Sequence, residues 1–272
     1  MKKIILYKVR EIEPYINWLY FFHAWQLTGK SDDVKEKLRA DALAMLREFD
    51  SKYNLHAIFS ILEVYSEGDD LVFETNRIPL LRQQKPNTDG KHNLCLADFI
   101  RPEDSKDKDH IGLFATTVDS GMETDYAKDP YKKMLAQTLA DRLAEATAEK
   151  MHEEVRKEYW GYAKDENLTM DELHLEKNKG IRPAIGYPSL PDTSVNFIID
   201  QMIGMKDIGI RLTESGAMKP HASVSGFMFA HPEAFYFDLG KIGEDQLRDY
   251  ANRRRVPVEM IRRFLENSLL KK

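Results

Sequence analysis

The order of the apolar segments is the feature that most limits the folds open to this chain of 272 residues. Two apolar runs, at 57–64 and 71–74, flank the turn Glu67-Gly68-Asp69-Asp70, and this pattern predicts a β-hairpin. Elsewhere too, strand-like segments follow one another and helical segments are grouped, instead of alternating one by one. This order predicts an α+β fold with a central antiparallel sheet and argues against a doubly wound parallel fold.

Helical periodicity marks several long segments. Apolar residues recur at helical spacing over 11–29 and 33–50, and most clearly over 131–159. The sequence Thr169-Met170-Asp171-Glu172 has the pattern of a capping box and predicts the start of a short helix, which we expect Gly180 to end. Together these segments supply the helices that flank the sheet.

The remaining apolar segments extend the same pattern to the C-terminus. A charged loop at 101–109 separates the apolar runs 94–100 and 111–118. The last third contains three predicted strands, at 211–215, 223–230 and 235–242. Two short predicted helices follow them, at 244–252 and 257–269. No internal repeat or linker interrupts the chain, so we expect residues 1–272 to form one domain.

Composition excludes several classes of protein. With 40 basic and 45 acidic residues the net charge is −5, which argues against a dedicated nucleic-acid-binding protein. The longest apolar stretches are far shorter than the ~20 residues of a membrane helix, and Lys8 and Arg10 interrupt any signal-peptide core. We therefore predict a soluble, cytoplasmic protein that binds neither nucleic acid nor a membrane. The single cysteine, Cys95, lies in an apolar run typical of a buried, inert thiol.

The usual catalytic motifs do not occur in the sequence. There is no glycine-rich dinucleotide loop, no Walker loop and no zinc-protease helix motif. The eight histidines are scattered, with the closest pair ten residues apart, so we expect no metal site. Nothing in the sequence indicates a nucleophile, and we predict no catalytic side chain.

Residues 180–191, here called the arginine segment, contain three prolines, two glycines, one arginine and one tyrosine. The prolines restrict the backbone, so this segment loses little entropy when it binds a ligand. Arg182 offers a planar fork suited to a carboxylate, Gly186 permits a positive φ, and Tyr187 offers a ring for stacking. The alternative interpretation is a stiff connection with a surface arginine.

Two further segments have both a functional and a structural interpretation. Small and hydroxyl residues dominate 212–226. The functional interpretation is that their backbone contacts a flat ligand, and the structural interpretation is a turn followed by an edge strand. The basic cluster Arg253-Arg254-Arg255 with Arg262-Arg263 suits docking of an acidic partner, or a solvated face of two terminal helices.

Blocks along nearly the whole chain resemble the activation domain of cobalamin-dependent methionine synthase. The blocks occur in the family's order from about residue 11 to 265. They are Tyr15-Ile16-Asn17-Trp18, Leu81-Arg82-Gln83-Gln84, Cys95-Leu96-Ala97-Asp98-Phe99, Ala140-Asp141-Arg142-Leu143-Ala144-Glu145, Tyr159-Trp160-Gly161-Tyr162-Ala163, Gly180-Ile181-Arg182-Pro183-Ala184, Leu212-Thr213-Glu214-Ser215, Ala222-Ser223-Val224-Ser225-Gly226 and His231-Pro232.

The resemblance implies a C-shaped α+β domain whose antiparallel sheet is flanked by helices. It also implies binding of S-adenosylmethionine and docking onto a cobalamin-binding module of methionine synthase. In the family, such a domain supports the reductive methylation of inactive cob(II)alamin, with an electron from flavodoxin or another reductant. The domain would be a component of a methyltransferase that acts only with partner modules in methionine biosynthesis.

The resemblance also implies which residues bind S-adenosylmethionine. Arg182 would pair with the methionyl carboxylate, and the backbone from Ala184 to Tyr187 would hold the adenosyl part. The implied cofactor-binding residues are Asn17, Arg182, Ala184, Gly186, Tyr187 and Tyr236. Glu145 and Glu176 match acidic family positions near the ligand, although a solvated glutamate explains each of them equally well.

The chain departs from the family pattern at this same site. The family aspartate that meets the ligand's ammonium is Asn17 here, which loses a charge-assisted bond of about 1–2 kcal/mol. Other differences fall at Ile185, at 189–193 and at 219–221. An alternative function is therefore a capping module that contacts the cobalamin domain but has lost S-adenosylmethionine binding. Because the chain begins with its own methionine, we expect a free-standing activation subunit.

Overall fold

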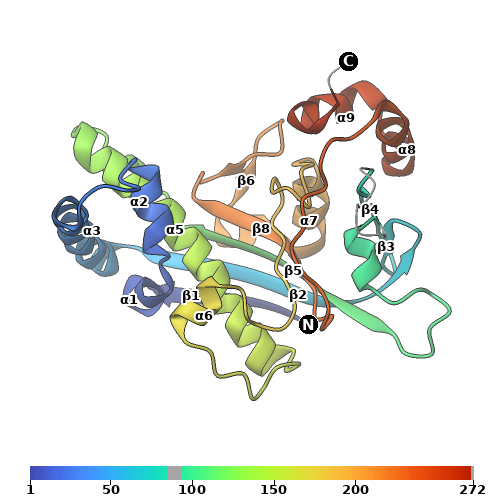
Figure 1. The fold of residues 1–272 in the computed structure, drawn as a ribbon, viewed down its shortest axis with the longest axis horizontal. Coiled ribbons are helices and arrows are strands. Elements are labelled where there is room, and N and C mark those ends of the chain that lie inside the picture. Colours follow the sequence, from blue (N-terminus) through green and yellow to red (C-terminus); the bar gives the residue numbers. More distant parts are fainter. Residues whose placement is uncertain (85–92, 271–272) are drawn as a thin grey trace.

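The structure, a computed structural model, describes residues 1–84 and 93–270. Its centre is a curled antiparallel sheet with the strand order β4-β3-β2-β5-β8 (Figure 1). β5 pairs along one edge of the long strand β2, while β1 and β3 pair with successive parts of its other edge. The strands are β1 (Lys2–Lys8), β2 (Asn54–Glu67), β3 (Asp70–Val72), β4 (Arg77–Pro79), β5 (Asp109–Val118) and β8 (Ser223–Met228), with a separate hairpin of β6 (Arg211–Leu212) and β7 (Met218–Lys219).

Helices cover both faces of this sheet. The α-helices are α1 (Val9–Ile12), α2 (Trp18–Ala24), α3 (Asp32–Lys52), α4 (Gly121–Thr124), α5 (Pro130–Glu154), α6 (Met170–His174), α7 (Val195–Ile203), α8 (Glu244–Arg254) and α9 (Val258–Phe264). The 3-10 helices are η1 (Glu13–Tyr15), η2 (Leu96–Phe99), η4 (Met205–Ile208) and η5 (Glu266–Ser268), and η3 (Val155–Tyr159) is a π-helix. The long helix α5 crosses the sheet diagonally (Figure 1). No helix of the described residues is both long and apolar enough to span a membrane.

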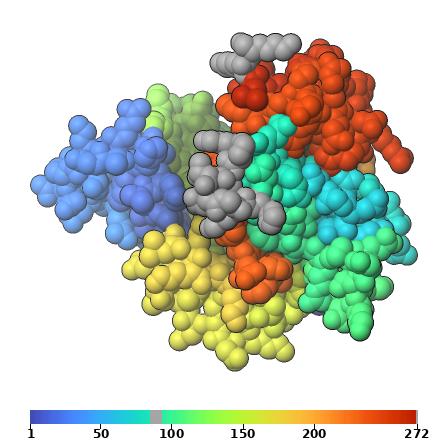
Figure 2. Space-filling model, turned by 45° about the vertical axis from the view of Figure 1, so that its right-hand side comes forward, coloured from blue at the N-terminus to red at the C-terminus, as the bar shows by residue number. Residues whose placement is uncertain are grey.

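The alternation of side chains along β2 separates two cores. Phe59 packs with Phe114 of β5 against α3 and α5, whereas the neighbouring Ile58 packs on the opposite face with α7 and η4. A third, smaller core holds α8 and α9 together around Tyr250. In Figure 2 the N-terminal helices in blue and the C-terminal helices in red lie on opposite sides of the molecule. This arrangement confirms the predicted α+β fold with an antiparallel sheet.

Most predicted elements are present, but the predicted helix over 11–29 is broken. Its residues form α1, η1 and α2, with Ile16 in an extended conformation between the last two. Pro14 is the second residue of the 3-10 turn, and the side chain of Asn17 accepts a hydrogen bond from the Leu19 N–H and so starts a new helix. The strand β1 and the helix α7 were not predicted.

The predicted strand at 235–242 is wrong. These residues are irregular, because the free edge of β8 is already occupied by the arginine segment through the bridges Ile181–Phe229 and Ala184–Gly226. The predicted helix end at Gly180 is also wrong, since α6 ends at His174.

Candidate functional site

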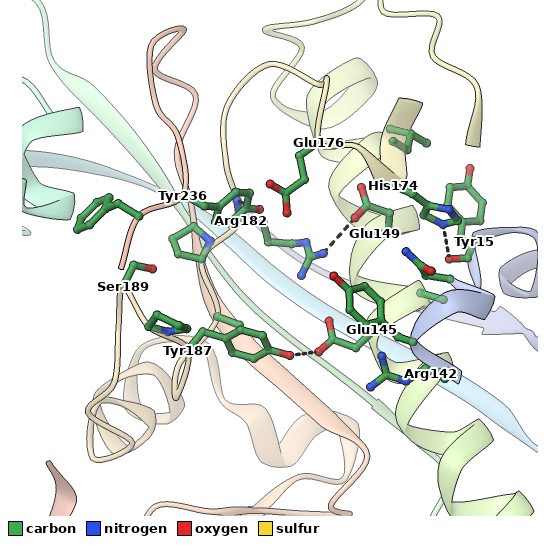
Figure 3. A pocket seen from close by; sticks show the side chains of 18 of the residues that line it. Tyr15, Arg142, Glu145, Glu149, His174, Glu176, Arg182, Tyr187, Ser189 and Tyr236 are labelled. Atoms are coloured by element: carbon green, nitrogen blue, oxygen red, sulfur yellow. Dashed lines mark hydrogen bonds and ion pairs between the residues drawn. The ribbon is translucent and has the colours of Figure 1, made fainter. Parts of the chain in front are cut away.

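A pocket of about 660 Å³ lies where several separate parts of the chain converge. One wall is the middle of α5, and the opposite wall is formed by residues 182–184, 187–189 and 236–238. The lining is completed by Tyr15, Asn17, Tyr20, Leu173, His174 and Glu176 (Figure 3). The pocket is therefore assembled from segments that only the tertiary fold brings together.

The backbone of the arginine segment continues the central sheet. The Ile181 N–H donates to the Phe229 carbonyl at 3.0 Å, and the Phe229 N–H donates back at 2.9 Å. The Ile185 N–H donates to the Ser225 carbonyl at 2.8 Å. These bonds fix the segment on the edge of β8, so Arg182 projects from a rigid support.

Two glycines make this close approach possible. A Cβ atom at Gly226 would lie 2.1 Å from the Pro183 carbonyl oxygen, and one at Gly180 would lie 2.2 Å from the Phe229 carbonyl oxygen. Gly180 also has a φ of +74°, which side-chain-bearing residues rarely adopt. Both positions therefore require glycine if the arginine segment is to lie against β8.

The Arg182 side chain is mostly buried and points into the pocket (Figure 3). Its Nη2 lies 3.1 Å from Oε2 of Glu149 on α5, and its guanidinium lies 5.6 Å from the centre of the Phe114 ring. Burial alone would lower the pKa of Arg182, but Glu149, Tyr236 and Glu145 outweigh it and raise the pKa above its usual value. The arginine is thus a permanent cation in this pocket.

Two tyrosines stand on either side of Arg182. Tyr236 accepts a hydrogen bond from the Arg182 main-chain N–H at 2.9 Å, and burial raises its pKa. The Tyr187 hydroxyl donates to the carboxylate of Glu145 (Figure 3), and burial, then Glu145, raises the pKa of this tyrosine. Both hydroxyls therefore stay protonated at neutral pH.

The pocket contains more carboxylates than cations. Glu145, Glu149, Glu176 and Asp238 line it together with Arg142 and Arg182. Glu176 has a φ of +56°, a strained conformation for a residue with a side chain. Burial, followed by repulsion from Glu149, raises the pKa of Glu176. A pocket of this kind suits a ligand that carries both positive and negative charge.

Behind Arg182, a buried ion pair supports the start of the arginine segment. Arg156, in the π-helix η3, is fully buried, and its Nε donates to Glu166 Oε2 at 2.8 Å. The other carboxylate oxygen of Glu166 accepts from the Lys179 N–H at 3.2 Å. A π-helix is rare and often marks a functional site. Here it places the Arg156 guanidinium beside Glu166, which in turn holds the backbone of Lys179 just before Arg182.

His152 is the second buried polar residue behind the pocket. Its Nε2 lies 3.2 Å from the Tyr162 hydroxyl. Burial lowers the pKa of His152 well below its usual value, and the positive charges of Arg156 and Arg182 lower it further. This histidine is therefore neutral, and its Nε2 shares a hydrogen bond with the Tyr162 hydroxyl.

The structure brings nearly all of the predicted binding residues together. The lining includes Asn17, Arg182, Ala184, Tyr187 and Tyr236. Gly186 is not part of the lining, but its φ of +90° turns the chain between Ala184 and Tyr187. Glu145 and Glu176 also line the pocket.

Sequence reasoning missed Glu149, which forms the ion pair with Arg182. A signal was present, because Glu145 and Glu149 are four residues apart on a predicted helix and so share one face. Tyr15, Tyr20 and His174 were missed as well, since the break between η1 and α2 that exposes this region was not predicted.

The two segments left open by the sequence have structural roles. Residues 212–226 do not line the pocket; their last part is the strand β8 that supports the arginine segment. In the basic cluster, three arginines are engaged within the fold: Arg253 with Asp70 and Asp249, Arg254 with Asp192, and Arg262 with Glu244. The exposed members are Arg255 and Arg263.

Cys95 is buried, as predicted, and burial raises its thiol pKa to about 12, which makes it inert. Within residues 1–84 and 93–270, no group of three or more His, Cys, Asp or Glu side chains is arranged to hold a metal ion.

The fold and the pocket define a single α+β domain with a pocket lined by charges of both signs. A family model described as the activation domain of vitamin B12-dependent methionine synthase matches residues 8–255, and the chain belongs to this family. The crystal structure of the MetH reactivation domain bound to AdoHcy is similar, with a TM-score of 0.93 and 35% sequence identity over 100% of this chain and 91% of that chain. The resemblance stated from the sequence is thereby confirmed.

Proposed function

We propose that this chain binds S-adenosylmethionine in the pocket beside Arg182 and supports reductive methylation of inactive cob(II)alamin. The cobalamin is carried by the cobalamin-binding module of a methionine synthase, and flavodoxin or another reductant supplies the electron. The observation that carries the proposal is the Arg182 pocket in a chain 35% identical to an AdoHcy-bound reactivation domain. AdoHcy is the product that S-adenosylmethionine leaves after giving up its methyl group.

The chemistry of this reaction lies in its substrates. The reduced cobalamin of the partner module is the nucleophile, and the sulfonium of S-adenosylmethionine is the methyl donor. The chain's own residues contribute placement, which lowers the entropic cost of bringing the two reactants together. Arg182 would bind the methionyl carboxylate as a charge-assisted fork. The backbone from Ala184 to Tyr187 would hold the adenosyl part.

Carboxylates around the pocket suit a cationic methyl donor. Glu145, Glu149 and Glu176 all line the pocket, and S-adenosylmethionine carries positive charge on its sulfonium and on its ammonium. These carboxylates favour the donor, with its additional sulfonium charge, over the product, whose sulfur is neutral, and this difference helps the product to leave.

A reactivation assay tests the proposal. The purified chain is mixed with the cobalamin-binding module in its cob(II) form, a chemical reductant and S-adenosylmethionine, and methylcobalamin is followed by its visible absorbance. We expect methylcobalamin to form with the wild type and with Arg211→Ala, an exposed arginine outside the pocket, and to be lost with Arg182→Ala.

One observation favours the alternative function, a capping module that contacts the cobalamin module without binding S-adenosylmethionine. Asn17 replaces a charged family residue, and its side-chain oxygen is already used to cap α2. Stable binding of the cobalamin module, combined with methylcobalamin formation that does not depend on added chain, would support the capping function and contradict the first proposal.

A further inference from the structure

The ion pair between Arg182 and Glu149 lies in the wall of the pocket rather than in the core. The two groups are 3.1 Å apart, and their side chains keep 11% and 20% exposure toward the pocket. The Nε of Arg182 is buried and has no hydrogen-bond partner among the described residues. The guanidinium therefore keeps donor capacity beyond the bond that Glu149 accepts.

An α-amino acid presents its carboxylate and its ammonium on the same carbon atom. A site that recognises both charges must therefore hold a cation and an anion next to each other. Arg182 and Glu149 meet this requirement, since they come from the arginine segment and from α5 and converge at one point of the pocket (Figure 3).

Asn17 does not supply an anion at this site. Its side-chain oxygen accepts the Leu19 N–H at 3.1 Å, which caps the N-terminus of α2. Its amide nitrogen has only donor hydrogens and cannot accept an ammonium proton. Asn17 can therefore offer the ammonium only a neutral acceptor, and a charged acceptor must come from another residue of this chain.

The other three carboxylates of the lining are less suited to this role. Asp238 accepts a hydrogen bond from the Gly240 N–H at 2.8 Å. Glu145 accepts the hydroxyl proton of Tyr187, which lies away from the Arg182 guanidinium (Figure 3). Glu176 is strained, and burial favours its neutral form. Of these four carboxylates, Glu149 is the one within hydrogen-bond distance of Arg182 in the described structure.

We propose that Glu149 accepts the α-ammonium of the ligand while Arg182 binds its α-carboxylate, so that this ion pair recognises the zwitterionic end of the ligand. This inference rests on the proposed S-adenosylmethionine binding. When the ligand binds, its carboxylate pairs with Arg182 and its ammonium pairs with Glu149. Neither of these two buried side chains is then left without an opposite charge. A ligand that lacks the amino group leaves Glu149 without a cation from the ligand and binds weakly.

The test uses S-adenosylhomocysteine, because its sulfur is uncharged and its ammonium is then the ligand's cation. Isothermal titration compares this ligand with the analogue that has hydrogen in place of the α-amino group. We expect the wild type to bind the analogue at least about tenfold more weakly. We expect Glu149→Gln to weaken S-adenosylhomocysteine by a similar factor and to leave the affinity for the analogue unchanged.

Glu145→Gln and Glu176→Gln are the matched controls, because each removes one negative charge from the same pocket. In these variants we expect the wild-type preference for the amino-bearing ligand to remain. The wild-type comparison of the two ligands does not depend on the folding of any variant. Glu149→Asp, which keeps the charge, should restore part of the preference.

The proposal is overturned if the wild type binds both ligands equally, or if Glu149→Gln keeps the wild-type preference. A wild type that binds neither ligand would instead contradict the proposed function itself. The two failures are therefore distinguished by the wild-type titrations alone.

Discussion

The main-chain N–H of Arg182 donates a hydrogen bond to the side-chain hydroxyl of Tyr236 at 2.9 Å. This bond joins the arginine segment to a stretch of irregular chain 54 residues later. It acts on the backbone of Arg182, while Glu149 contacts the guanidinium, so backbone and side chain of one residue are fixed by two different elements.

Replacing Tyr236 with Phe removes this acceptor and keeps the aromatic ring. The loss of one hydrogen bond corresponds to about 1 kcal/mol, and we expect an approximately fivefold lower affinity for S-adenosylmethionine. Titration calorimetry measures this change. The matched control is Tyr131→Phe, which loses a hydroxyl bond to Asp41 outside the pocket and should bind normally. Equal affinities of both variants would show that the bond does not position Arg182.

The buried pair of Arg156 and Glu166 gives a prediction for stability. Arg156→Met leaves Glu166 as a buried charge without its partner, which costs about 3–5 kcal/mol. Urea unfolding should therefore show a clearly lower midpoint. Lys108→Met, which removes an exposed ion pair with Glu63, should leave the midpoint nearly unchanged. An unchanged midpoint for Arg156→Met would contradict the structural role of this pair.

His152 predicts a specific pH dependence of stability. Burial, Arg156 and Arg182 lower its folded-state pKa, so below pH about 6.5 the unfolded chain binds a proton that the folded chain does not. Folding stability is therefore lost as the pH falls below this value. Between pH 7.5 and 5.5 the histidine contributes a loss of about 1.4 kcal/mol.

The comparison of wild type with His152→Gln isolates this contribution from that of the carboxylates. The free energy of unfolding in urea is measured at pH 7.5 and 5.5 for both proteins. The variant should lose about 1.4 kcal/mol less than the wild type over this interval. An identical loss in both proteins would show that His152 takes up a proton in the folded state.

Asn17→Asp tests whether position 17 lies at the ammonium end of the ligand. Aspartate caps a helix as well as asparagine does, so the melting temperature should not fall. The added charge supplies a second acceptor beside the ligand, and we expect about tenfold tighter S-adenosylmethionine binding. Unchanged affinity would place this residue away from the ligand's ammonium.

The elements with strong periodicity were predictable from the sequence alone. The predicted segments 33–50 and 131–159 correspond to α3 and to α5 with η3, and the predicted hairpin is present as β2 and β3. The errors have tertiary causes: β8 has only one free edge, and the arginine segment occupies it in place of residues 235–242. Phe235 and Phe237 instead both pack against Phe99, and Tyr236 between them lines the pocket.

The candidate site was predictable where the chemistry was concentrated in one segment. Arg182, Ala184, Gly186 and Tyr187 stand within six residues, and their composition marked them before any fold was known. Glu149 was not predictable as a partner of Arg182, because the crossing of α5 over the sheet edge decides which glutamate meets the arginine. Helical spacing shows that two residues share one face of a helix, but it does not show which other element packs against that face.

The most direct test of the central claim is isothermal titration of S-adenosylmethionine into the purified wild-type chain and into Arg182→Ala. We predict saturable one-to-one binding to the wild type, with the binding heat lost in the variant while its circular dichroism shows that it is folded at the titration temperature. No binding heat and no thermal stabilisation of the wild type at millimolar ligand would contradict the claim that this pocket binds S-adenosylmethionine.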